Sequence, residues 1–364
     1  MEFCTFETWV HNFTPFRKIP RGNQLGRIQM KLKLLAAAAL GIIVVPLAVS
    51  PAGAQKYNLT LSGASPGGLW SRIGGGIDAA IAKAYPGSTV SYQTSSGGLA
   101  NIPLVSRGKV PMGLATDGEL NAVYNGYKGK AALKNVRVLF RAYAPSWRFQ
   151  ATHLILSKNF ADKHGIKTFA DIVNKKAPLR VAINRRGNMD SDVSAMVMAL
   201  MGATTDKIKS WGGQVVHAAS KEMVSLYLDR RIDMVNFGIA YKHPRVREIA
   251  KGVTPVLLPI PDDVSAKVAK AFAGATCPIK PGDYKWAPAG SSSVCIGAVI
   301  VVNASMDNGT AYNLAKGMVE QIEEFKKKSH RLIAKNAKKK FMAVKAAAPF
   351  HPGAAKYFKE AGLM

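Results

Sequence analysis

The chain has 364 residues, of which 50 are Lys or Arg and 22 are Asp or Glu, so its formal net charge is +28. This length is enough for two lobes with separate cores or for one large α/β domain. Nucleic-acid binding is the first hypothesis that such a positive charge raises. However, the lysines are spread over predicted helix faces rather than gathered around aromatic residues, so we expect no nucleic-acid binding.

The N-terminal part of the chain predicts export. Residues 30–33 are a short basic segment, residues 34–49 form an apolar core, and residues 52–54 read Ala-Gly-Ala, an A-x-A cleavage site. This order is typical of a secretory signal peptide, which we place at 30–54. A retained membrane anchor is the alternative, although an apolar run interrupted by proline is short for a membrane span.

Residues 1–29 precede the predicted signal peptide and show no pattern of their own. A signal peptide normally opens a chain, so we expect Met30 to be the natural start and 1–29 to be a non-native extension. Without residues 1–54 the chain keeps 44 basic and 20 acidic residues, a net charge of +24. The signal peptide predicts that this mature protein resides in the periplasm.

Two glycine-rich loops follow in successive units of strand, loop and helix. The first unit spans 57–84 with its loop at 62–68, and the second spans 89–105 with its loop at 94–98. Each loop places free backbone N–H groups and hydroxyls at the positive end of a helix, which suits a carboxylate or phosphate. Two such loops side by side would form one cleft.

The loops taken alone admit a second interpretation. Neither has the spacing of a dinucleotide-binding loop or a P-loop. Both can be ordinary turns between a strand and a helix, with Ser65 and Ser95 as helix N-caps. Further along, Thr116 is expected to cap a helix at 117–124, and residues 136–143 alternate as a strand.

The order of these motifs is more specific than any one of them. Gly-x-x-x-Gly-Gly at 63–68 precedes Trp70, Thr-x-Ser-Gly-Gly-x-x-Asn spans 94–101, and Met-Gly-Leu-Ala-Thr-Asp spans 112–117. This order resembles the TAXI family of TRAP-transporter solute receptors, which are extracytoplasmic binding proteins. The resemblance covers roughly residues 57–364.

The resemblance implies the fold class α/β, with two doubly wound lobes and a hinge, as in type II periplasmic binding proteins. We expect lobe I at 55–145, lobe II at 146–290, and a return to lobe I with the C-terminal helices at 291–364. The apolar run at 293–302 predicts one buried strand. The tail at 349–357 also matches the family.

A third loop, at 184–192, departs from the family pattern Gly-x-x-Gly-Ser-Gly-Thr. Gly187 is kept, but Arg185, Arg186 and Asn188 replace smaller residues. An arginine at the mouth of such a loop can hold a carboxylate with two hydrogen bonds. Projection of either arginine into solvent is the alternative.

Three further features bear on chemistry. Cys277 and Cys295 remain once the leader is removed, and they form either a disulfide or two buried thiols. His351 precedes Pro352, which favours a helix N-cap over a catalytic base. The sequence has no spacing typical of a metal site, so we expect no metal and no cofactor.

The lysines and arginines at 326–340 are the densest basic part of the chain. A solvated helix face is the simplest interpretation. A docking face for an acidic partner or an anionic membrane is the alternative.

The resemblance implies a receptor, not an enzyme, that acts as a monomer. It would bind a small carboxylate or amino acid, such as glutamate or 2-oxoglutarate, and deliver it to the membrane subunit of a TRAP transporter. A receptor for an ABC importer and a sensory input protein are the alternatives. The expected ligand-binding residues are Ser65, Trp70, Ser95, Ser96, Asn101, Thr116, Asp117, Tyr143, Arg185, Asn188 and Phe237.

Among these residues, Ser65, Ser95, Ser96 and Arg185 would hold carboxylate oxygens. Asp117 would accept a hydrogen bond from an ammonium or hydroxyl group of the ligand. The three aromatic side chains would form walls of the site, or would pack in the lobes instead.

Overall fold

The structure is a computed structural model that describes residues 55–364. The predicted extension at 1–29 and the predicted signal peptide at 30–54 lie outside the described residues. Within 55–364, none of the helices has the length and apolar character needed to cross a membrane.

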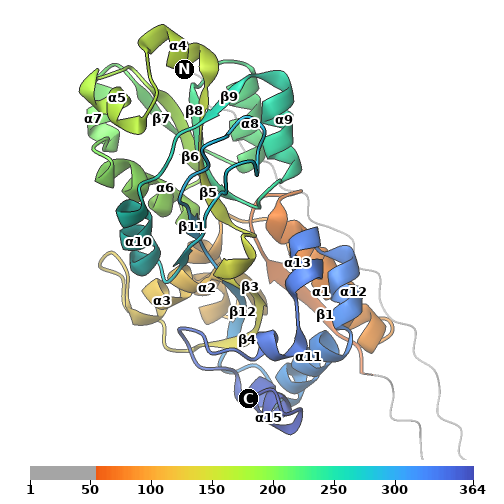
Figure 1. Cartoon of the computed structure of the whole chain (residues 1–364). Helices are drawn as coiled ribbons and strands as arrows, with labels where there is room; N and C mark the ends of the chain where they lie inside the picture. The colour runs from red at the N-terminus through yellow and green to blue at the C-terminus, as the bar shows by residue number, and fades with distance from the viewer. Residues whose placement is uncertain (1–54) are drawn as a thin grey trace, which may run out of the picture. The chain divides into compact units, whose positions relative to one another are not determined.

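The described chain forms two sheets (Figure 1). The first sheet consists of β1 (Asn58–Ser62), β2 (Thr89–Gln93), β3 (Met112–Thr116), β4 (Val136–Tyr143) and β12 (Ala298–Asn303). Its strand order is β2-β1-β3-β12-β4. Strands β2, β1 and β3 are parallel, whereas β12 runs antiparallel to both of its neighbours.

The second sheet is also mixed. It consists of β5 (Ala151–Ser157), β6 (Arg180–Asn184), β7 (Gln214–Ala218), β8 (Met234–Ile239), β9 (Pro255–Leu257), β10 (Ala275–Thr276) and β11 (Val294–Cys295). The strand order is β10-β11-β5-β8-β6-β7, with β9 paired to β5. Strands β7, β6 and β8 are parallel, and β5 pairs antiparallel with β8.

Helices accompany each sheet, and we refer to a sheet with its helices as the first or the second lobe. The helices of the first lobe are α1 (Leu69–Ala84), α2 (Gly98–Ser106), α3 (Asp117–Asn125), α11 (Asn308–Glu320), α12 (Ile322–Lys328), α13 (Arg331–Asn336), α14 (Lys339–Met342) and α15 (Pro352–Glu360). Those of the second lobe are α4 (Lys158–His164), α5 (Phe169–Asn174), α6 (Met189–Leu200), α7 (Thr205–Ser210), α8 (Ser220–Leu228), α9 (Pro244–Gly252) and α10 (Asp262–Ala271). In Figure 1 the blue helices α11, α12 and α13 lie beside the orange helix α1.

Both faces of each sheet are buried, as expected for a doubly wound fold. Along β12, Ile300 packs into the core formed with α1 and α11, while its neighbour Val301 packs into a separate core formed with α2. In the second sheet, Ile183 packs into one core and its neighbour Ala182 packs into another core on the opposite face. Adjacent strand residues point to opposite faces, so an apolar run on a strand indicates a sheet covered on both sides. The predicted fold class is confirmed.

The chain crosses twice between the two sheets. The first crossing runs from β4 to β5 through a short 3-10 helix, η1 (Pro145–Trp147). The second runs from β11 to β12 through Ile296 and Gly297. A Cβ at Gly297 would lie 2.5 Å from the Asp117 carboxylate and 2.8 Å from the Pro145 ring, so only glycine fits this crossing.

The prediction of one strand at 293–302 was wrong. The run contains two strands, because Cys295 pairs with β5 and β10 in the second sheet, whereas Ala298 pairs with β3 and β4 in the first. A continuous apolar run shows only that its residues are buried, not in which sheet they lie. Residues 293–302 are buried first in the second lobe and then in the first.

Two local predictions of helix starts are confirmed. Thr116 caps α3, and its Oγ1 accepts a hydrogen bond from Glu119 N while the Glu119 carboxylate accepts one from Thr116 N. His351 is the N-cap of α15, with Pro352 at the first helical position.

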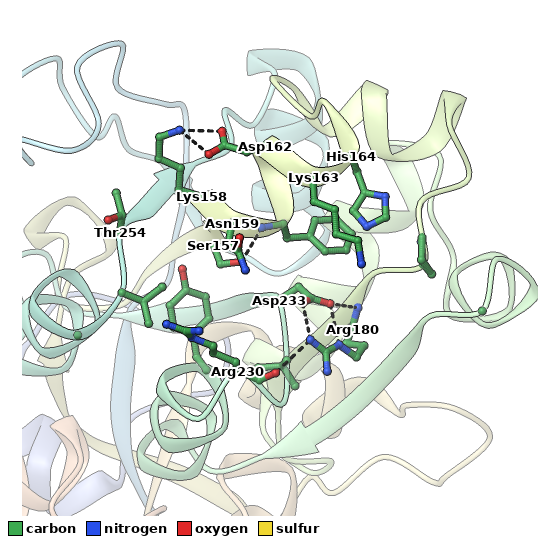
Figure 2. Close-up of a pocket in the computed structure, with 17 residues that line it drawn as sticks. Ser157, Lys158, Asn159, Asp162, Lys163, His164, Arg180, Arg230, Asp233 and Thr254 are labelled. Atoms are coloured by element: carbon green, nitrogen blue, oxygen red, sulfur yellow. Dashed lines mark hydrogen bonds and ion pairs between the residues drawn. The ribbon is translucent and has the colours of Figure 1, made fainter.

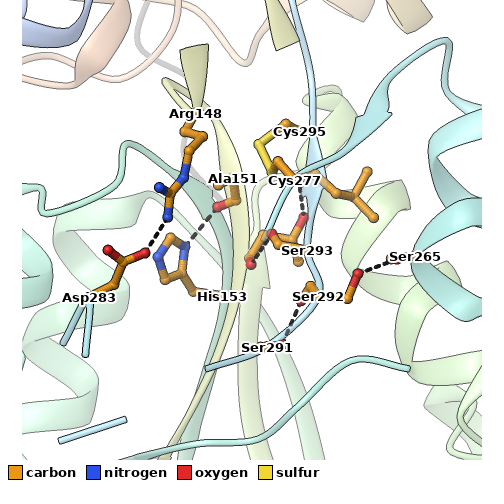
Figure 3. Close-up of a disulfide and its surroundings, with 12 residues drawn as sticks. Arg148, Ala151, His153, Ser265, Cys277, Asp283, Ser291, Ser292, Ser293 and Cys295 are labelled. Atoms are coloured by element: carbon orange, nitrogen blue, oxygen red, sulfur yellow. Dashed lines mark hydrogen bonds and ion pairs between the residues drawn. A yellow bond between two sulfur atoms is a disulfide. The ribbon is translucent and has the colours of Figure 1, made fainter. Parts of the chain in front are cut away.

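Cys277 and Cys295 form a disulfide, which decides between the two alternatives left open by the sequence. The bond joins the segment after β10 to β11, directly before the second crossing. Figure 3 shows it beside Ala151 of β5, with which both cysteines form a small apolar cluster.

Candidate functional site

A cavity of about 50 Å³ lies between the two lobes, at the ends of β1, β6, β7 and β8. Open α/β sheets bind ligands at this edge, where the strands end and the helices begin. The lining residues come from both lobes and from the first crossing. They are Ala64, Ser65, Gly68, Leu69, Trp70, Gln150, Asn184, Asn188, Asp190, Ser220, Gly238, Ile239 and Arg245.

Hydrogen-bond donors form one part of this lining. Helix α1 begins after Gly68 and helix α8 after Ala219, and in 55–364 no side chain caps the first-turn N–H groups of either helix. Arg245, from α9, lines the same cavity, and its Nη2 donates to Gly67 O at 3.5 Å. Two positive helix ends and an arginine create a local environment that favours an anion.

Hydrogen-bond acceptors form the other part. Asp190 and Asn184 are 4% and 6% exposed, and the Oδ1 atom of each has no hydrogen-bond partner among the described residues. The pKa of Asp190 is raised to about 7, mainly because the carboxyl group is buried. The charge of Glu119 contributes to this rise in the pKa, and the hydrogen bond from Gln150 opposes it. Both residues line the cavity, so these oxygens can accept hydrogen bonds from a molecule that enters it.

A chain of hydrogen bonds holds Asp190 in place. Trp70 Nε1 donates to Tyr143 OH at 2.9 Å, and this hydroxyl in turn donates to Gln150 Oε1. Gln150 Nε2 then donates to Asp190 Oδ2 at 2.7 Å. The chain starts on α1 of the first lobe and ends on α6 of the second, so it couples the two walls of the cavity.

Close packing also constrains Asp190 from the side of β8. A Cβ at Gly238 would lie 2.1 Å from Asp190 Oδ1. Substitution of this glycine would therefore displace the carboxylate.

The lobes also touch directly next to the cavity. Arg185 Nη2 donates to Ser65 Oγ at 2.9 Å and approaches Ser95 O at 3.4 Å. Met189 N, at the start of α6, donates to Glu119 Oε1 of the first lobe at 2.9 Å. The second and third glycine loops therefore meet across the gap between the lobes.

The structure places three of the predicted ligand-binding residues in the cavity wall: Ser65, Trp70 and Asn188. Asn188 also caps α6, because its Oδ1 accepts from Asp190 N at 2.9 Å. Arg185 lies beside the cavity and holds Ser65 rather than lining the space itself.

Four predicted residues of the first lobe make contacts within the fold. Asn101 is fully buried and donates to Gly63 O and Leu114 O. Ser95 Oγ lies 2.6 Å from Asn101 Oδ1, and Thr116 caps α3. Asp117 accepts from Arg141 Nη1 at 2.8 Å.

The remaining three predicted residues lie in different environments. Tyr143 is fully buried and contributes its hydroxyl to the chain that ends at Asp190. Phe237 lies in a core of the second lobe. Ser96 lines a separate groove of about 1240 Å³ on the other side of the third loop.

Sequence reasoning missed five polar residues of the cavity: Gln150, Asn184, Asp190, Ser220 and Arg245. Ser220 begins α8, two residues after β7 ends, so the rule that ligands bind beyond the carboxyl ends of strands could have found it. Gln150 and Arg245 belong to the crossing and to α9, and only the folded chain brings them to this cavity.

A groove of about 870 Å³ lies elsewhere on the second lobe, near the start of β6 and β8 (Figure 2). Its charged side chains are largely paired with each other. Lys158 Nζ lies 2.7 Å from Asp162, and Arg180 Nη2 lies 2.6 Å from Asp233. The cavity between the lobes, with its unpaired acceptors, is therefore the better candidate. In the part of the chain that the structure describes, no group of His, Cys, Asp and Glu side chains is arranged to hold a metal ion.

Comparison with solved structures places this fold. The periplasmic binding protein BugD is 13% identical, with a TM-score of 0.51 over 85% of this chain and 98% of that one. PhnD1 from Prochlorococcus marinus, solved in complex with methylphosphonate, is 10% identical, with a TM-score of 0.50 over 84% of this chain and 99% of that one. At such identities the likeness concerns the fold.

The arrangement of two α/β lobes is therefore similar in fold to that of the periplasmic binding protein BugD. A family model matches residues 61–362, so the chain belongs to the NMT1-like family.

Proposed function

We propose that this protein is an extracytoplasmic receptor for a small carboxylate or amino acid and that it binds this ligand in the cavity between the lobes. One observation carries the proposal: the uncapped starts of α1 and α8 and Arg245 line the same cavity as Asp190 and Asn184, each of which has an unpaired oxygen. The donors suit a carboxylate, and the acceptors suit an ammonium or hydroxyl group.

This arrangement favours an α-amino acid over a keto acid. Glutamate offers both a carboxylate and an ammonium group, whereas 2-oxoglutarate has no donor for Asp190. An unpaired partner costs about 1–3 kcal/mol at a buried site, which corresponds to a preference of roughly 5- to 150-fold.

Ligand entry requires the lobes to move apart. A space of about 50 Å³ has room for only a few water molecules. We propose that the first lobe, residues 55–144 with 298–364, and the second lobe, residues 148–295, move as two units about the two crossings. The Arg185 to Ser65 contact would form as they close.

We further propose that the receptor serves a TRAP-type secondary transporter, as the resemblance of its first two loops and tail to TAXI receptors implies. Export would use the signal peptide at 30–54, with Met30 as the start. The two alternatives are a receptor for an ABC importer and a sensory input protein. The membrane protein that co-purifies with the receptor distinguishes these two from a TRAP receptor.

The test is ligand-induced stabilisation of the mature protein, residues 55–364, after unfolding and refolding to remove carried ligand. Binding at 100 times Kd adds about 2.7 kcal/mol, which is a clear rise in melting temperature. We expect a rise with glutamate or a related amino acid and a smaller one with 2-oxoglutarate.

Variants locate the binding site. Arg245→Ala should abolish the rise in melting temperature, whereas Arg247→Ala, on the same helix, should keep it. Arg185→Ala should weaken the rise. No response to any carboxylate or amino acid, or an equal response in both α9 variants, would contradict the proposal.

A further inference from the structure

The first lobe carries a concentrated positive surface whose residues do not line the cavity. Residues 327–345 contain eight Lys and Arg and no Asp or Glu. All eight side chains are exposed. We call them the basic face: Lys327, Lys328, Arg331, Lys335, Lys338, Lys339, Lys340 and Lys345.

Packing of three short helices turns these charges outward. Phe325 of α12, Ile333 of α13 and Met342 of α14 are buried in the core of the first lobe. Helix α12 packs on α1, and α13 follows it along the same side (Figure 1). The apolar side of each helix is thus used by the fold, so the charged side is left for solvent or for a partner.

The basic face has no internal partner. Within residues 55–364, none of its eight side chains forms an ion pair or a side-chain hydrogen bond. Other exposed lysines of this chain do find carboxylates, for example Lys158 with Asp162 and Lys267 with Asp263. Eight unpaired cations within one short segment repel each other, so the fold retains a surface that an anionic partner would stabilise.

We propose that the basic face binds the surface of an anionic phospholipid membrane. Seven of its eight cations are lysines. Lysine is a flexible point charge that suits a diffuse negative surface, whereas arginine suits a defined carboxylate. Val344, one of the few exposed large hydrophobic residues, is 46% exposed within the same segment. An apolar side chain among lysines suits the interface of a bilayer.

Membrane attraction would concentrate the receptor near its transporter without involving the ligand cavity. Basic residues near an anionic membrane each contribute about 1 kcal/mol, and salt screens this attraction within roughly 10 Å. Reversal of three charges should therefore weaken binding by about 100-fold or more.

The test is co-sedimentation of the mature protein with vesicles of phosphatidylglycerol and phosphatidylcholine. We compare Lys338→Glu/Lys339→Glu/Lys340→Glu with a matched triple variant of the second lobe, Lys251→Glu/Lys270→Glu/Lys285→Glu. These three control lysines are also exposed, and both triples lower the net charge equally. A second basic-face triple, Lys327→Glu/Lys328→Glu/Lys335→Glu, serves if the first does not fold.

We expect binding to the anionic vesicles that declines with salt, no binding to pure phosphatidylcholine, and loss of binding only in the basic-face variants. Equal loss in the control triple would show a general charge effect and overturn the proposal. If the protein does not bind anionic vesicles at all, the membrane proposal is also overturned. An acidic protein would then be the alternative partner for the basic face. Ligand-induced melting shifts should be unchanged in all three triples, which separates this test from that of the receptor function.

Discussion

Glu119 of the first lobe accepts a hydrogen bond from the backbone N–H of Met189 in the second lobe, at 2.9 Å. The same carboxylate accepts from Gly98 N at 3.2 Å and from Thr116 N at 2.8 Å. One fully buried side chain therefore satisfies the starts of three helices, α2, α3 and α6. Because α6 belongs to the other lobe, Glu119 links the two lobes directly.

Glu119→Gln should weaken ligand binding by tenfold or more. Glutamine presents an N–H group where the carboxylate now accepts from a backbone N–H, so at least one charge-assisted hydrogen bond of about 1.5–3 kcal/mol is lost. Calorimetric titration of ligand measures the change. Glu222→Gln is the control, since Glu222 is an exposed carboxylate that accepts from Ala219 N within the second lobe only. Unchanged affinity in Glu119→Gln would show that Met189 does not need this partner for closure.

Asp190→Asn should stabilise the ligand-free protein in a manner that depends on pH. The folded-state pKa of Asp190 is raised to about 7 by burial, above its ordinary value of 3.8. Between these values only the unfolded state is ionised, so the wild type loses stability as pH rises and the loss levels off above 7. The variant should gain up to roughly 4 kcal/mol at pH 7 and above, and nothing below pH 3.8.

Thermal melting across pH measures this gain, with Asp206→Asn, at an exposed position, as the control. The same variant should bind amino acids weakly at every pH. In the wild type, affinity for an amino acid should rise with pH through about 7, because the ionised carboxylate balances the ammonium group. A melting difference that does not vary with pH would contradict the burial argument.

Acid should destabilise the protein through two stacked histidines. The rings of His243 and His330 lie 6.2 Å apart between centroids, at the starts of α9 and α13. Burial lowers the pKa of His243 to about 3 and that of His330 to about 4, and the charges of Arg72, Arg245, Arg247 and Arg331 act in the same direction. As pH falls below 6.5 only the unfolded state gains protons, so stability falls until about pH 3.

Replacement of both histidines by asparagine should remove this part of the acid sensitivity. Asparagine keeps the N-cap that each imidazole now provides to Arg245 N or Leu332 N. The expected benefit is on the order of 3 kcal/mol per histidine at the acid limit, read from melting temperatures between pH 7 and pH 4. An acid dependence identical to that of the wild type would assign the effect to other groups.

Reduction or removal of the disulfide should destabilise the second lobe. The Cys277–Cys295 bond closes a loop with a sequence separation of 18, which corresponds to about 3 kcal/mol in the chain-entropy model. Cys277→Ala/Cys295→Ala should therefore melt at a lower temperature than the oxidised protein and should be insensitive to reductant. If the reduced wild type and the variant both melt like the oxidised protein, the bond contributes nothing to stability.

Local patterns predicted the local structure of this chain well. The helix beginning at Leu69, the capping of α3 by Thr116 and the cap at His351 all depend on residues adjacent in sequence. Sequence reasoning failed at 293–302, where an apolar run passes from one buried sheet into another. Because both faces of each sheet are buried, the residues do not alternate between apolar and polar, and no such pattern marks the boundary between the two strands.

By itself, the sequence determined the α/β class and the glycine loops that place helix starts at one edge of each sheet, because periodicity, caps and turns are short-range properties. Tertiary structure alone decided which polar groups share the cavity. Arg245, Gln150 and Asp190 are distant in sequence, and their chemistry depends on burial and on partners from the other lobe. The same folding directs Asn101 and Asp117 to internal partners, although their motif resembles a binding site. The physical reason is that hydrogen-bond satisfaction and desolvation are properties of the assembled lobes, not of any one segment.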